Sequence, residues 1–231
     1  MKILLFDVDG TLIRSGSGLG LAHNMAFVEG LKKVYGADIT SMDLKGYAGR
    51  TDRFIASDVL RKKGFDEDAV SEGLRALFDE MVKSFAQDVV KKDYRDCLLD
   101  GVAPTLEELS KNDQYLIGLL TGNVTDIASM KMRAVGLAKY FRIGGFGNMS
   151  ERRSDLIDVA IAEGRRKGLL SDVEMKQVYI IGDTKHDINC AKEKGAVSVA
   201  IATGNEKKDV LATFKPDYLI ERMPELIHIV E

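Results

Sequence analysis

Short runs of consecutive apolar residues recur along the chain, and each run is followed by glycine, aspartate, asparagine or threonine. Runs of this length with such endings predict buried strands. We predict five strands, at Ile3–Phe6, Tyr115–Leu120, Val178–Ile181, Val197–Ile201 and Tyr218–Ile220. Because continuously apolar strands are typical of parallel sheets covered on both faces, the pattern indicates an α/β protein.

Helical periodicity fills the intervals between these strands. The predicted helices lie at Val102–Leu109, Ser154–Lys167 and Asp187–Lys194, and Gly195 is placed to end the last of them. Strands that alternate with helices predict a Rossmann-like parallel sheet with helices on both faces.

Residues 15–92 follow a different pattern, because no convincing strand occurs there. Two apolar stripes have helical spacing: Leu21, Met25, Val28, Leu31 and Tyr35, and then Leu74, Phe78, Met81, Phe85 and Val89. We therefore predict an inserted α-helical cap at 15–92 and an α/β core made of 1–14 and 93–231. The stretch RSGSGLG at its start is a candidate hinge.

Composition and charge narrow the classes of function. A chain of 231 residues is long enough for one core and a small inserted domain. The net charge of −3 gives no basic surplus, so neither nucleic acid nor an anionic membrane is an expected partner. No apolar run approaches the roughly 18 residues of a membrane span, and the first run is too short for a signal peptide.

The cysteine content bears on the compartment. Cys97 and Cys190 are too few for a disulfide framework, so a cytoplasmic location is the default expectation. Either a monomer or a homodimer is compatible with the sequence.

Acidic and hydroxyl residues follow three of the predicted strands. The sequences are DVDGT at 7–11, TGN at 121–123 and GDTKHD at 182–187. Parallel strands bring their carboxyl ends to one edge of the sheet, where ligands bind. That edge would crowd four carboxylates, and a hard divalent cation such as Mg²⁺ would offset their repulsion. The four are Asp7, Asp9, Asp183 and Asp187.

The first acidic pair is suited to a division of labour. Side chains two residues apart on an extended segment point to the same side, so Asp7 and Asp9 would share one site. Asp7 is the candidate nucleophile, and Asp9 could protonate a leaving oxygen and later activate water. Thr121 and nearby backbone N–H groups could bind an anion. Each motif alone is common in turns, but three in order after strands are more specific.

Together these motifs resemble those of the haloacid dehalogenase superfamily of phosphatases, over nearly the whole chain. The resemblance is strongest to its phosphoglycolate-phosphatase-like and β-phosphoglucomutase-like branch, and the helical insert is similar to the helical cap of that family. It implies that Asp7 is nucleophile and Mg²⁺ ligand, and that Asp9 is the acid/base, with its backbone carbonyl on the metal.

The resemblance also assigns the later motifs. It implies that Thr121 binds the phosphoryl oxygen, helped by the backbone of Gly122 and Asn123. It implies that Asp183 binds Mg²⁺ directly, and that Asp187 acts through water or by orienting a basic residue.

One motif departs from the usual family pattern, which places a lysine before the helix that precedes the last acidic motif. This chain reads GNMSERRSDLIDVA there, without lysine. Arg153 resembles the arginine variant of the motif, and Arg152 is the alternative. Both could also be surface arginines. Arginine binds phosphate through two parallel donors, whereas lysine acts as a point charge.

The predicted cap contributes one candidate substrate contact. Arg50, in LKGYAGRTD at 44–52, could bind a second anionic group such as a carboxylate or phosphate, or could be a surface arginine at a turn. We assign structural roles to His23, His186 and Cys190.

We therefore expect Mg²⁺-dependent hydrolysis of a small phosphorylated metabolite through an aspartyl-phosphate on Asp7. A phosphosugar mutase of the same superfamily is the alternative, because Asp9 serves both reactions. A non-catalytic binding protein is a third possibility, and the intact set of Asp7, Asp9, Thr121 and Asp183 argues against it.

Overall fold

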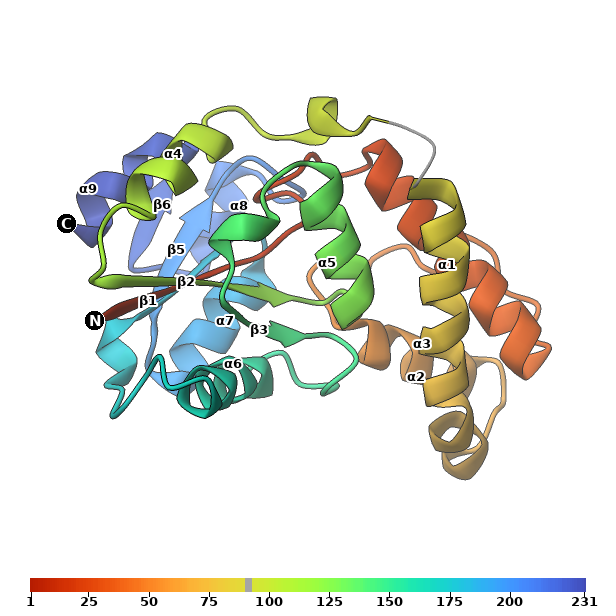
Figure 1. Cartoon of the computed structure of the whole chain (residues 1–231). Helices are drawn as coiled ribbons and strands as arrows, with labels where there is room; N and C mark the ends of the chain where they lie inside the picture. The colour runs from red at the N-terminus through yellow and green to blue at the C-terminus, as the bar shows by residue number, and fades with distance from the viewer. Residues whose placement is uncertain (90–92) are drawn as a thin grey trace.

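A parallel six-stranded sheet organises the chain (Figure 1). The structure, a computed structural model, describes residues 1–89 and 93–231. The strand order is β3-β2-β1-β4-β5-β6. The strands are β1 (Lys2–Phe6), β2 (Tyr115–Thr121), β3 (Ile143–Phe146), β4 (Val178–Gly182), β5 (Val197–Ile201) and β6 (Tyr218–Ile220).

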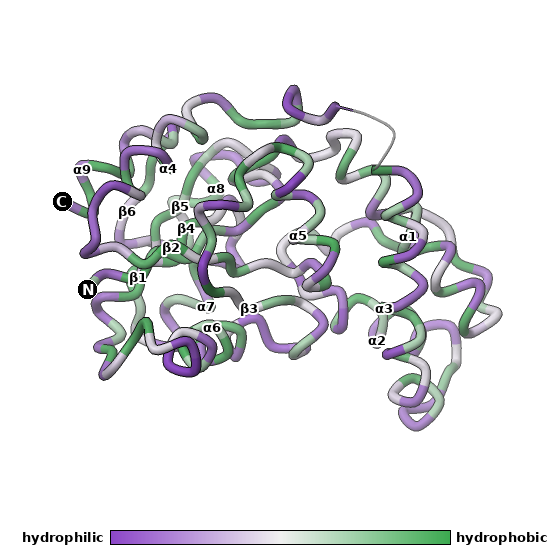
Figure 2. The backbone as a smooth tube through the Cα atoms, viewed as in Figure 1, coloured by the Kyte–Doolittle hydropathy of each residue, from purple (hydrophilic) through white to green (hydrophobic). Residues whose placement is uncertain are grey.

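Side-chain alternation along the central strand builds two apolar layers. Leu4 and Phe6 of β1 pack on the face covered by α4 (Val102–Leu109), α5 (Thr125–Ala134) and α9 (Leu226–Val230). Ile3 and Leu5 pack on the opposite face, beneath α6 (Asp155–Arg166) and α7 (Lys185–Lys194). Helix α8 (Lys208–Thr213) packs beside β6. The α/β class and the covered parallel sheet are thus confirmed, and Figure 2 shows the hydrophobic strands at the centre.

The five predicted strands and three predicted core helices are all present, within two residues at each end. Gly195 ends α7 in a left-handed conformation, as expected. Strand β3 was not predicted. Its sequence, IGGF, contains only two apolar side chains, so it gives no apolar run, and its place at the sheet edge is set by pairing with β2.

Three helices form a lobe beside the sheet, α1 (Gly18–Tyr35), α2 (Asp52–Lys62) and α3 (Glu67–Val89), drawn from red to yellow in Figure 1. We call residues 18–89 the helical lobe. They lie within the segment where we expected a cap. The predicted boundary between 92 and 93 falls outside the described residues. In the part of the chain that the structure describes, no helix is long and apolar enough to cross a membrane.

The predicted apolar stripe of α1 is wrong in its first turns, whereas its member Leu31 is buried as expected. Leu21 and Met25 are 57% and 56% exposed, whereas Leu19, Ala22 and Phe27 are buried. Small residues decide which face of α1 is buried, because they allow α3 to approach that face closely. A Cβ atom on Gly30 would lie 2.9 Å from Leu77 Cδ1. On α3 the predicted stripe is buried from Leu74 to Phe85.

The unequal burial of Leu31 and Leu21 predicts unequal effects of two identical substitutions on stability. Leu31→Ala should destabilise the protein by about 2–5 kcal/mol, because Leu31 is fully buried against the lobe core. Leu21→Ala, on the exposed face of the same helix, should change the free energy of unfolding by less than about 0.5 kcal/mol. Urea denaturation would measure both, and equal effects would contradict the assigned phase.

Candidate active site

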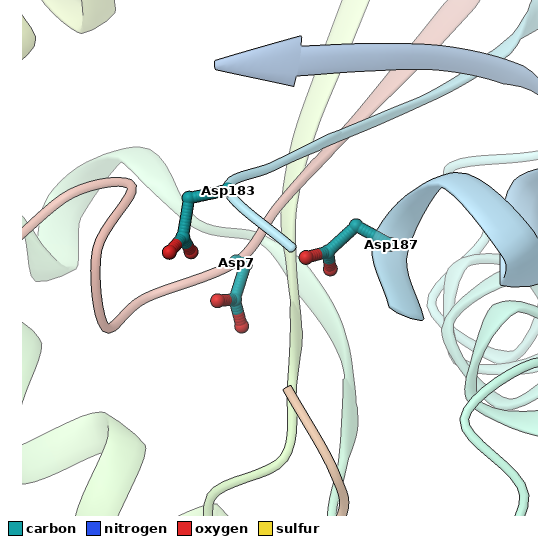
Figure 3. A group of neighbouring side chains, drawn as sticks. All are labelled: Asp7, Asp183 and Asp187. Carbon is teal, nitrogen blue, oxygen red and sulfur yellow. The ribbon is translucent and has the colours of Figure 1, made fainter. Parts of the chain in front are cut away.

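Three acidic side chains from separate segments meet at the carboxyl edge of the sheet (Figure 3). Asp7 follows β1, Asp183 follows β4, and Asp187 lies in the first turn of α7. One carboxylate oxygen from each lies within 4.8 Å of the other two, and all three residues are buried. They meet because β1 pairs directly with β4, so that both strands end at the same place.

A glycine allows the closest of these approaches. Gly10 has a φ of +97°, and a Cβ atom there would lie 2.3 Å from Asp183 Oδ2. Only glycine accepts both the backbone conformation and the contact. The next residue, Thr11, donates from Oγ1 to Asp183 Oδ1 at 3.3 Å. The turn after β1 therefore helps to hold the acid that follows β4.

Arg153 is the cation of this cluster. Its Nη2 donates to Asp7 Oδ1 at 2.9 Å, to Asp187 Oδ1 at 2.5 Å and to the Leu120 carbonyl at 3.1 Å, and the side chain is buried. Arg152, the other candidate, has an exposed side chain that pairs with Glu193. Of the two arginines, the structure brings Arg153 to the acidic residues.

Asp187 is held on both of its oxygens. Oδ1 accepts from Arg153, and Oδ2 accepts from the Thr184 backbone N–H at 3.1 Å and from its hydroxyl at 2.6 Å. These bonds also cap the N-terminus of α7. Asp187 is thus arranged to orient Arg153.

Burial makes the crowded carboxylates unfavourable as anions. Burial raises the pKa of Asp7 to about 7, against the opposing effect of Arg153. Burial, together with the charges of Asp7 and Asp187, raises the pKa of Asp183 well above its ordinary value. An oxygen-binding divalent cation would favour the ionised forms, so this donor set fits Mg²⁺.

The Asp9 carboxylate is not a member of that three-acid cluster. Both of its oxygens accept from Lys131 Nζ, at 2.8 and 2.7 Å, and Oδ2 also accepts from Asn123 Nδ2 at 2.9 Å. Burial raises the pKa of Asp9, but the Lys131 charge and the hydrogen bonds outweigh it and hold that pKa below its usual value. Both oxygens of the Asp9 side chain are thus bound by Lys131 and Asn123, so its backbone carbonyl is the candidate metal ligand.

The loop after β2 forms a wall of a cavity of about 280 Å³. Gly122 and Asn123 line it together with Asp7, Asp9 and Arg153. The fully buried Thr121 hydroxyl lies behind them and accepts from the Asn123 backbone N–H at 3.3 Å and from Asn123 Nδ2 at 3.0 Å.

The helical lobe closes the cavity on another side. The Arg50 guanidinium lies 4.6 Å from the centre of the Phe54 ring and lines the cavity. The Asp52 backbone N–H donates to the Gly122 carbonyl at 2.7 Å. A Cβ atom on Gly122 would lie 2.0 Å from the Arg50 carbonyl oxygen, so glycine is required where the lobe meets this loop.

Sequence reasoning missed several residues of the site. Lys131 contacts Asp9, and His23, which we had assigned a structural role, contacts Lys131 at 3.4 Å between Nζ and Nδ1. Asn205 donates its backbone N–H to Asp183 Oδ2 at 2.7 Å. Only Lys131 left a signal in the sequence, as a lysine on the apolar face of α5 with Ile127 and Met132.

Comparisons with known proteins agree with this geometry. The sequence profile of the haloacid dehalogenase-like hydrolases matches residues 4–201, so the chain belongs to that family. The phosphoglycolate phosphatase of Escherichia coli K12 is 27% identical over 237 aligned positions, which cover 96% of this chain and 89% of that protein.

Two solved structures share the fold. A haloacid dehalogenase-like family hydrolase from Streptococcus pneumoniae aligns with a TM-score of 0.67 at 22% identity, and covers 100% of this chain and 99% of its own. A hydrolase from Pseudomonas syringae aligns with a TM-score of 0.69 at 18% identity, over 99% and 97%. The expected family, fold class and phosphatase class are confirmed.

The raised pKa of Asp7 predicts how the stability of the metal-free protein depends on pH. The folded state keeps the Asp7 proton up to a pKa of about 7, whereas the ordinary value is 3.8. Because the folded state binds more protons between these values, stability should fall as the pH rises from 4 to 7. Calorimetry in EDTA should show a shallower fall for Asp7→Asn. Asp113→Asn, at an exposed position, should match wild type, and an unchanged slope in Asp7→Asn would contradict the prediction.

Proposed function

We propose that this chain is an Mg²⁺-dependent phosphatase for a small phosphomonoester that carries a second anionic group. The observation that carries the proposal is the Asp7 carboxylate, which lines the cavity and is held by Arg153 within a cluster of buried acids. Phosphoglycolate is the first candidate substrate for two reasons. A relative of similar length is named a phosphoglycolate phosphatase, and the cavity, at about 280 Å³, suits a small ester.

Asp7 is the nucleophile in this proposal. Arg153 binds Asp7 through Oδ1 alone, and Asp7 Oδ2 has no hydrogen-bond partner among residues 1–89 and 93–231. Oδ2 would attack phosphorus in line with the leaving oxygen and form an aspartyl-phosphate. The Arg153 guanidinium and the backbone N–H groups of the 122–123 loop would stabilise charge on the phosphoryl oxygens, and the Thr121 hydroxyl would hold that loop through Asn123.

Asp9 is the acid/base. It would donate a proton to the leaving alcohol in the first step and take a proton from water in the second, in which the water attacks the aspartyl-phosphate. Lys131 favours the ionised form, which is the form that the second step requires. Asn123 and Lys131 fix the carboxylate at the cavity wall.

Mg²⁺ would be held by Asp7, Asp183 and the backbone carbonyl of Asp9, with Asp187 acting through Arg153. When bound, it would neutralise negative charge on the carboxylates and on the phosphoryl group, which otherwise repel each other. The support for this cofactor is the all-oxygen donor set and the burial of the three acids.

A phosphosugar mutase is the competing proposal. Such an enzyme would return the phosphoryl group to another hydroxyl of the sugar, and it requires a second phosphate site, for which Arg50 is the candidate. Accumulation of an isomeric sugar phosphate with little free phosphate would favour the mutase.

The nucleophile and cofactor are tested together by phosphate release. Wild type should hydrolyse small phosphate esters with Mg²⁺ and lose the activity in EDTA. Asp7→Asn should lower kcat by at least about 1,000-fold, because no aspartyl-phosphate forms. Asp113→Asn, at an exposed position remote from the cluster, serves as the matched control. Near-native turnover in Asp7→Asn would exclude this mechanism.

The second anionic group is tested at Arg50. A charge-assisted hydrogen bond to a substrate carboxylate would be worth about 1.5–3 kcal/mol, so Arg50→Gln should raise KM for phosphoglycolate by about 10- to 100-fold. Ethyl phosphate, which has no carboxylate, should be hydrolysed with little change in KM. Lys45→Gln, an exposed cation of the same loop, is the control. An equal loss on both esters would remove Arg50 as the carboxylate contact.

A further inference from the structure

A buried polar chain of four residues joins the helical lobe to Asp9. Asp52 Oδ2 lies 3.0 Å from His23 Nε2, His23 Nδ1 lies 3.4 Å from Lys131 Nζ, and Lys131 Nζ contacts both oxygens of Asp9. Asp52, His23 and Lys131 are buried. The members come from α2, α1, α5 and the loop after β1, so tertiary packing alone brings them together.

The donors and acceptors of these side chains decide which atom donates in each hydrogen bond of the network. The Lys131 ammonium has three N–H donors and no acceptor, so His23 Nδ1 must accept. The proton of the His23 ring then lies on Nε2 and is donated to Asp52. Lys131 thus uses its three donors on Asp9 Oδ1, Asp9 Oδ2 and His23 Nδ1.

Burial makes the position of Lys131 depend on these partners. Its side chain is completely buried, and a buried ammonium is tolerated only where an anion and further acceptors surround it. Asp9 supplies the anion, and His23 supplies the third acceptor. The lysine therefore holds the Asp9 carboxylate in one orientation, with His23 as the support on its other side.

The support from the lobe is itself anchored to the core. Asp52 Oδ2 also accepts from the Val124 backbone N–H at 2.9 Å, and the Asp52 backbone N–H donates to the Gly122 carbonyl. The residue that orients His23 is thus bound to the loop that forms the cavity wall. His23 thus meets Lys131 from a lobe that is hydrogen-bonded to this loop.

We propose that Lys131 is a positioning residue for Asp9, and that the His23–Asp52 pair of the helical lobe aligns Lys131, so that contact between lobe and core places the acid/base for proton transfer. The proposal rests on the proposed function, in which Asp9 protonates the leaving alcohol. Lys131 lines the cavity, but its three donors are taken by Asp9 and His23, so it acts through Asp9 in this arrangement.

Leaving-group dependence is the readout that separates positioning from a structural role. An alkyl phosphate needs a proton on its leaving oxygen, whereas p-nitrophenolate departs without one. Lys131→Met should therefore lower kcat/KM for phosphoglycolate by about 100-fold or more, the scale of general acid catalysis. On p-nitrophenyl phosphate, kcat/KM should fall by less than about 10-fold, because kcat/KM does not include hydrolysis of the aspartyl-phosphate that both esters share.

Two further variants complete the experiment. His23→Leu should show the same selective loss for the alkyl ester, to a smaller extent. Arg133→Met removes an exposed cation from the same helix and should match wild type on both esters. Equal losses on the two esters, or no loss in Lys131→Met, would overturn the proposal. Asp7→Asn must lose both activities if the proposed function holds, so failure of the function and failure of this inference are distinguishable.

Nitrogen NMR of the His23 ring decides the arrangement without any turnover. Wild type should show the proton on Nε2 and an unprotonated Nδ1, and Lys131→Met should shift the Nδ1 resonance. A wild-type ring protonated at Nδ1 would overturn the proposal even if Lys131→Met did not fold.

Discussion

Repulsion among buried carboxylates is the constraint on which the site depends. Asp7, Asp183 and Asp187 approach one another within 4.8 Å at the end of a sheet that excludes water from them. Such a cluster is stable in its ionised form only with compensating positive charge. Arg153 supplies one part of it from a loop that reaches the site before α6 begins, and the oxygen donors that remain suit a divalent cation. The parallel sheet brings the acids together, and their excess negative charge makes the site suitable for a divalent cation.

The same constraint explains the glycines and the cap of α7. Gly10 is required where the turn after β1 passes the Asp183 carboxylate. Asp187 closes the N-terminus of α7 through Thr184 and binds Arg153 through its other oxygen. The Asp187 carboxylate thus caps the helix locally and also forms a tertiary ion pair. Local structure and site chemistry are consistent with each other here, as a uniquely folded sequence requires.

The features that could be predicted from the sequence are those that depend on consecutive residues. Apolar runs located five strands, and the acids directly after them located the cluster, because parallel strands share one edge. Features that depend on contacts between distant segments were not predictable. Strand β3 contains two glycines and is defined by its pairing, the phase of α1 is set by the close approach of α3, and His23 meets Lys131 only in the folded chain. Lys131 could have been found, since a lysine on an apolar helix face requires a buried partner.

Separate cations on the two neighbouring aspartates divide their labour. Arg153 binds Asp7 and Asp187, whereas Lys131 binds Asp9 and lies on a different element. Without separate cations, two acids so near each other would titrate as a coupled pair, and neither would have a protonation state of its own. The helical lobe contacts both cations, through the Gly49 carbonyl on Arg153 at 3.0 Å and through His23 on Lys131. Displacement of the lobe would therefore remove an acceptor from each cation, so that Asp7 and Asp9, the proposed nucleophile and acid/base, would lose their alignment together.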